Sequence, residues 1–242
     1  MSPSTVVQLV VTFGVPCLVA ASIWHWCRRP IGRATFALIF LFGATVVFPV
    51  IRLGNWIEPS VAGLAGHFYV NELIMQLLAV AIPEELGKGL VALGALRFLR
   101  MPASPAVWLS CGAAAYGGFA ALEGALGALA NEGLLKTLAG HSIGACLHCS
   151  WGIITAWFAW NGWRRAGYRA WSWPFALLVP VVLHAVGNAS LLDAPDNTKA
   201  TADEISLAEV MVMLSGIGAG LITAVLAGFS LCAARRTHGQ SE

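Results

Sequence analysis

Charged side chains are scarce in this chain of 242 residues. Aspartate, glutamate, lysine and arginine make up 11% of it, whereas 58% of the residues are hydrophobic and the mean hydropathy is +0.75. A water-soluble domain cannot bury so much apolar surface, which excludes an ordinary globular protein. We therefore expect an all-α, polytopic membrane protein.

Three further features are missing. The net charge is only +2 and no basic cluster lies outside short loops, so the sequence does not indicate a nucleic-acid-binding protein. The six cysteines all lie in or beside apolar segments, which argues against a disulfide framework. Residues 1–8 carry no positive charge, so the first apolar segment is expected to be a retained helix and not a signal peptide. Without repeats or long loops, residues 1–242 are expected to form a single transmembrane domain.

Seven apolar segments are long enough to cross a hydrocarbon core of about 30 Å at about 1.5 Å per residue. The third and the seventh are longer than a membrane requires, which predicts a tilt, a kink or an interfacial stretch. The seven spans are expected at about residues 5–27, 34–53, 69–99, 105–130, 141–162, 173–192 and 205–233.

The loops between these segments differ in charge. Ten of the 14 lysines and arginines follow spans one, three, five and seven, and Glu242 is the only acid on that side. The positive-inside rule then predicts an external N-terminus and a cytoplasmic C-terminus. The basic residues are Arg28, Arg29, Arg33, Arg97, Arg100, Arg164, Arg165, Arg169, Arg235 and Arg236, and the acids of the opposite loops are Glu58, Glu132, Asp193, Asp196, Asp203 and Glu204.

The most informative stretch is residues 79–88, in the middle of the third span. Glu84, Glu85 and Lys88 lie within five positions of one another in an otherwise apolar run. One ionisable residue at the centre of a membrane helix costs roughly 2.5–3.5 kcal/mol, so three together indicate a functional site. The spacings i,i+4 and i,i+3 allow Lys88 to pair with both carboxylates. Pro83 is expected to kink the helix just before them.

Three later spans also carry polar residues at depth. Glu123 lies in span four, His148 in span five, and His184 and Asn188 share one helical face of span six. Each could be a structural residue that bonds to a neighbouring helix. Together with Glu84 and Glu85, however, they fall at overlapping depths on four successive spans, as a buried hydrated site requires.

These motifs resemble those of the PrsW family, within the superfamily that also holds the CAAX-prenyl endopeptidases and the Abi proteins. The resemblance covers about residues 70–192, which would be the catalytic core helices. The CAAX branch has EExxxR and FxxxH, whereas this chain has a lysine one position earlier and a glutamate in place of that histidine, which is closer to PrsW. The motifs, in chain order, are EExxK (Glu84, Glu85, Lys88), FxxxE (Phe119, Glu123), a deep histidine (His148) and HxxxN (His184, Asn188).

The resemblance implies an intramembrane endopeptidase that cleaves a membrane-protein substrate. We expect Glu84 to act as the general base on water, with Glu85 and Lys88 supporting it. His184 and Asn188 would stabilise the oxyanion. Glu123 and His148 would position the water or donate to the leaving amine.

Two other interpretations stay open. A zinc-dependent protease of the same fold would use Glu123, His148 and His184 as ligands, because two histidines and one carboxylate form a common zinc set. We rank metal-free catalysis slightly ahead, since no HExxH motif presents two ligands from one helix. A non-catalytic helix-binding scaffold or sensor is the second alternative, because a fold does not guarantee activity. A transporter or haem carrier is less well supported.

The resemblance also implies the partner and the location. We expect a single-pass transmembrane substrate, similar to an anti-sigma factor. The small loops separately suggest that a substrate helix enters laterally between spans. The protein would be a multi-pass component of a bacterial plasma membrane.

Overall fold

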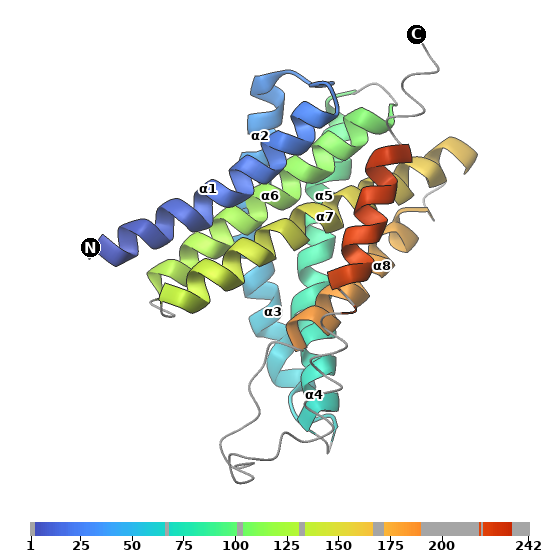
Figure 1. Ribbon diagram of the computed structural model, residues 1–242. Helices are drawn as coiled ribbons and strands as arrows, with labels where there is room; N and C mark the ends of the chain where they lie inside the picture. The colour runs from blue at the N-terminus through green and yellow to red at the C-terminus, as the bar shows by residue number, and fades with distance from the viewer. Residues whose placement is uncertain are drawn as a thin grey trace.

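The computed structural model describes residues 3–65, 68–100, 104–130, 134–166, 172–189, 218 and 220–233. Helices make up almost all of these residues, and none of them forms a strand (Figure 1). The elements are α1 (Pro3–Trp26), α2 (Arg33–Thr45), α3 (Val47–Val61), α4 (Phe68–Met75), the π-helical segment η1 (Gln76–Ala81), α5 (Ile82–Phe98), α6 (Pro105–Leu129), α7 (Leu134–Ala166) and α8 (Ser172–Ala189). A last helix covers Gly220–Ala233.

Within the described residues, four helical stretches are long and apolar enough to cross a membrane. They are Ser4–Trp26, Arg33–Val61, Pro105–Leu129 and Ser142–Arg164. This confirms an integral membrane protein built from helices. The predicted count of seven spans is compatible with the helices observed, although much of span seven lies outside the described residues. The direction of the chain across the membrane stays a prediction.

The second predicted span, at about 34–53, lies within a longer apolar helical stretch, Arg33–Val61. The structure has two helices that meet at Val46, and the second of them continues to Val61. The polar residues after the predicted end of this span, from Gly54 onward, suggested a loop. The backbone nevertheless stays helical, because Gly54 and Asn55 disfavour a helix only by about 1 kcal/mol or less, and Pro59, which disfavours it more strongly, comes only in the last turn.

The irregularity expected at Pro83 takes a different form. The chain widens into η1 over the six residues before α5, and the Ile82 N–H bonds to the carbonyl of Leu77, five residues back. Pro83 therefore stands in the first turn of α5, where its missing N–H costs little. Such π-helical turns often occur at functional sites, and this one directly precedes Glu84 and Glu85.

The centre of the bundle is α6, whose residues from Pro105 to Ala121 are all buried. It packs against α1, α2, α5 and α7 (Figure 1). Small residues permit this: a Cβ at Gly118 would collide with the carbonyl oxygen of Phe40 in α2, and one at Gly112 with that of Gly152 in α7. Close backbone approach through small residues is typical of membrane helix bundles.

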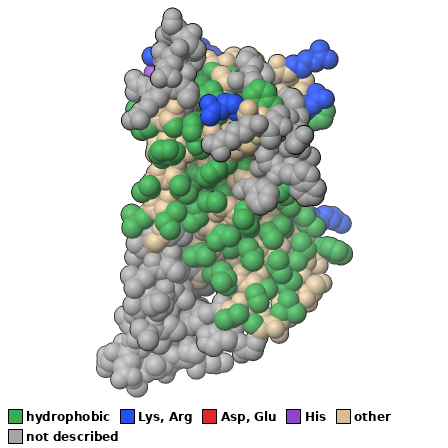
Figure 2. Space-filling view, turned by 90° about the vertical axis from the view of Figure 1, so that its right-hand side faces the viewer, with side chains coloured by type: hydrophobic (Ala, Val, Ile, Leu, Met, Phe, Trp, Pro, Cys, Tyr) green, Lys and Arg blue, Asp and Glu red, His purple; other side chains and the backbone are tan. Residues whose placement is uncertain are grey.

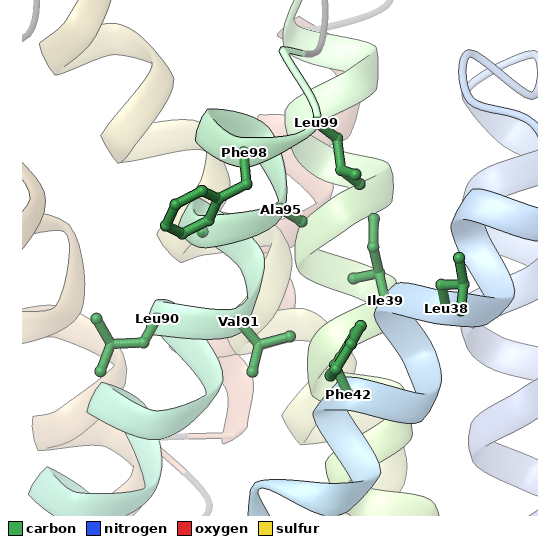
Figure 3. Close-up of a pocket in the computed structure, with 9 residues that line it drawn as sticks. Leu38, Ile39, Phe42, Leu90, Val91, Ala95, Phe98 and Leu99 are labelled. Carbon is green, nitrogen blue, oxygen red and sulfur yellow. The ribbon is translucent and has the colours of Figure 1, made fainter.

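Many large hydrophobic side chains of the described residues are exposed on the outer surface. Figure 2 shows one face on which hydrophobic side chains cover much of the middle and the lower right, while most of the lysine and arginine side chains in view lie toward the upper end. An apolar groove of about 360 Å³ lies between α2 and α5. Leu38, Ile39 and Phe42 form one wall, and residues from Leu90 to Leu99 form the other (Figure 3).

Candidate functional site

The first turn of α5 forms one side of a buried ionic cluster. Lys88 Nζ lies 2.7 Å from Glu85 Oε1 and 3.1 Å from Glu84 Oε2, as the helical spacing predicted. Glu85 and Lys88 are fully buried, and Glu84 is 7% exposed. Such charges are tolerated at this depth only because each carboxylate has a cation beside it.

His184 brings α8 to the same carboxylates. Its Nδ1 lies 2.9 Å from Glu85 Oε1, and its Nε2 lies 3.8 Å from Glu84 Oε2. The short contact with Glu85 orients the imidazole, so that Nε2 points toward Glu84. A helix packed across the bundle thus adds a nitrogen donor to the pair supplied by α5.

His148, on α7, closes the cluster. Its Nδ1 lies 3.0 Å from Lys88 Nζ, and its Nε2 lies 3.1 Å from Glu123 Oε2 on α6. The Glu123 side chain is 37% exposed, whereas His148 is buried. Four helices, α5 to α8, therefore contribute to one site.

Asn188, another predicted site residue, forms its hydrogen bond with a residue outside the ionic cluster. It lies four residues beyond His184 on α8, and its Nδ2 donates to Gln76 Oε1 at 3.2 Å. Gln76 in turn donates to Glu72 Oε1 at 3.0 Å. The amide therefore lies beside the ionic cluster, at the start of η1. Sequence reasoning missed Gln76, although a glutamine in an apolar run, two turns before Glu84, was an available signal.

Aromatic rings surround the charges. Lys88 Nζ lies 4.5 Å from the ring centroid of Phe119, 5.3 Å from that of Tyr116 and 5.8 Å from that of Trp151. Trp151 also stacks on His184, with centroids 4.5 Å apart and planes at 22°. Sequence reasoning did not single out Trp151, because one tryptophan among ten carries no distinctive pattern.

Three residues could hold a metal ion together. Ligand atoms of Glu84, His148 and His184 all lie within 4.8 Å of one another, and all three residues are buried. The set predicted from the sequence contained Glu123 in place of Glu84. In the structure, Glu123 contacts the Nε2 atom of His148. Two imidazoles and one carboxylate suit zinc, with a fourth position left for water.

The surroundings of these three residues fit a metal as well. Histidine ligands usually contact a carboxylate through their second ring nitrogen, which fixes the ring. Here Glu85 contacts Nδ1 of His184 and Glu123 contacts Nε2 of His148. Glu85 Oε2 is buried and accepts no hydrogen bond from the described residues, so an oxygen remains for a bound water.

Comparison with known proteins identifies the family of this chain. Searches of curated proteins and of solved structures found no match. Residues 32–217, however, match the family described as PrsW family intramembrane metalloprotease. The match includes every residue of the ionic cluster and extends over more than half of the chain. This protein therefore belongs to the PrsW family of intramembrane proteases.

Proposed function

We propose that the protein is a metal-dependent intramembrane endopeptidase, with Glu84, His148 and His184 as the metal ligands. The observation that carries this proposal is the group of three buried ligand atoms within 4.8 Å of one another, supplied by three different helices. The family description, an intramembrane metalloprotease, supports the same assignment.

The residues around the ligands have separate tasks in this proposal. A divalent ion held there would supply Lewis-acid activation of a water and of the peptide carbonyl. Glu85 is the general base, because its Oε2 is buried and accepts no hydrogen bond from the described residues. Its other oxygen contacts Lys88 and His184, which hold the carboxylate in place. Glu123 orients His148.

We propose a single-pass membrane protein, similar to an anti-sigma factor, as the substrate, and a bacterial plasma membrane as the location. A substrate whose cleavage site is in the membrane must bring an apolar segment to α5. The groove between α2 and α5 supports this, because its α5 wall begins at Leu90, two residues beyond Lys88. Asn188 and Gln76 would bind the substrate backbone from the other side of the cluster.

One observation favours a second candidate, metal-free catalysis. The Lys88 ammonium contacts Glu84, Glu85 and the Nδ1 of His148 at 2.7–3.1 Å, so an internal cation already neutralises the donor set. In this case Glu84 acts as the base on water, and His184 with Asn188 stabilises the oxyanion.

The test is cleavage of candidate single-pass proteins by the full-length enzyme in liposomes. Wild type is compared with Glu84→Gln and His184→Gln, and Glu58→Gln in α3 serves as a matched control outside the site. Bound metal is measured by mass spectrometry, and turnover is measured with a chelator and after zinc is added back.

The proposal expects stoichiometric metal, loss of turnover with the chelator, recovery with zinc, and inactivity of both site variants. Turnover that survives the chelator but is lost in Glu84→Gln would favour the metal-free candidate. Specific binding of a substrate helix without any cleavage by wild type would instead identify a scaffold.

A further inference from the structure

Trp151 contacts both histidines of the site. Its indole stacks on His184 with centroids 4.5 Å apart, and it meets His148 edge-on, with centroids 5.0 Å apart and planes at 84°. The side chain is buried, with the residue 3% exposed. The plane of the indole therefore determines where the flat face of His184 can lie.

The indole is held by a residue from the far end of the chain. Trp151 Nε1 donates to Thr223 Oγ1 at 3.2 Å, and Thr223 is 1% exposed. Thr223 lies in the helix Gly220–Ala233, drawn in red in Figure 1. This helix follows the last residue of the family match, residue 217.

A buried indole N–H needs an acceptor, because leaving it unpaired costs more than an ordinary hydrogen bond contributes. The hydroxyl of Thr223 provides that acceptor. It also restrains rotation of the indole, since stacking alone does not determine how a ring is turned in its own plane. His184 is then held on one edge by Glu85 and on one face by Trp151.

We propose that Thr223 is a positioning residue of the active site, acting through Trp151 on His184. The last helix is then part of the working enzyme and not only an additional membrane anchor. This inference rests on the proposed function for its effect on turnover, but not for its effect on the geometry of His184.

The experiment uses full-length protein and compares Thr223→Val, which keeps the shape but loses the acceptor, with Thr223→Ser, which keeps the hydroxyl. Ser230→Ala is the matched control, because Ser230 is a buried residue of the same helix whose hydroxyl, among the described residues, donates to the Leu226 carbonyl oxygen at 2.8 Å. Loss of one hydrogen bond predicts that kcat falls about 3- to 10-fold in Thr223→Val, with KM unchanged. Thr223→Ser and Ser230→Ala are expected to match wild type.

Two further measurements separate positioning from simple packing. In a Trp151→Phe background, which has a ring but no N–H, Thr223→Val should have no additional effect on kcat. In protein labelled with ¹³C-histidine, the His184 resonance, assigned from its loss in His184→Gln, should shift in Thr223→Val, because ring currents of a stacked indole depend on its orientation.

An unchanged His184 resonance in Thr223→Val overturns the inference, as does a kcat loss that is equally large in the Trp151→Phe background. If the resonance shifts while wild type cleaves no substrate, the positioning inference stands and the proposed function fails.

Discussion

Lys88 is the residue on which the charge balance of the site depends most. Its ammonium is fully buried and lies 2.7 Å from Glu85 and 3.1 Å from Glu84. Lys88→Met keeps most of the side-chain length and leaves no large cavity, but removes the cation. Two carboxylates then remain close together in a medium of low dielectric.

Removing one partner of a buried ion pair costs about 3–5 kcal/mol, because the other charge stays uncompensated. Native proteins are stable by only about 5–15 kcal/mol, so we expect a large loss of stability in Lys88→Met. Adding Glu85→Gln should restore part of this loss, since it removes one of the two uncompensated charges. Arg97→Met, at the exposed end of the same helix, should change stability by less than about 0.5 kcal/mol.

The stabilisation of the folded protein by zinc provides a second test of the role of Lys88. A ligand that binds only the folded state at about 100 times its Kd stabilises it by about 2.7 kcal/mol. Lys88 Nζ contacts two of the three candidate ligands, so its removal should increase the stabilisation by zinc above that of wild type. The assay is unfolding of purified protein in detergent, with zinc and with a chelator. A loss below about 1 kcal/mol in Lys88→Met, equal to that of Arg97→Met, would refute the account of the cluster as a charge-balanced site.

Three further predictions concern packing, substrate access and the outer carboxylate. Gly118→Ala should destabilise the fold by about 1–3 kcal/mol, because the added methyl group collides with the α2 backbone. Gly14→Ala is the control, because a methyl group there contacts nothing within 4 Å. Equal melting temperatures of the two variants would contradict this prediction. Gly94→Leu should raise KM about 4- to 15-fold and leave kcat unchanged, because the new side chain takes space in the groove that one or two methylene groups of the substrate would occupy. An unchanged KM would indicate that the substrate does not bind in this groove. Glu123→Gln should weaken zinc binding about 10- to 100-fold in a competition titration without unfolding the protein, because the Glu123 carboxylate orients His148. An unaltered zinc affinity would show that Glu123 does not support the metal site.

Much of the architecture could be predicted from local sequence. Apolar runs of membrane length are unambiguous: α1 and α6 lie close to the predicted 5–27 and 105–130, and the stretch Ser142–Arg164 of the longer helix α7 lies close to 141–162. The pairing of Lys88 with both glutamates also followed from helical spacing, since the three residues share one helix. The extension of α3 and the form of η1 could not be predicted, because polar residues can continue a helix and a π-turn leaves no local signature.

The candidate site residues could be selected from the sequence for a physical reason: charges and imidazoles are energetically costly in an apolar run, so those that occur there stand out. Their membership of four successive spans also suggested one shared depth.

Which residue contacts which was decided only by the tertiary structure. The rotation of one helix against another places Glu84 with the two histidines, Glu123 behind His148, and Asn188 on Gln76. It also brings Thr223 to Trp151 across 72 residues of chain. By itself, the sequence determined the membrane class, most of the spans and the polar residues within them, because these depend on hydrophobicity and helical period alone. The partners of those residues depend on how the helices pack, which no local pattern records.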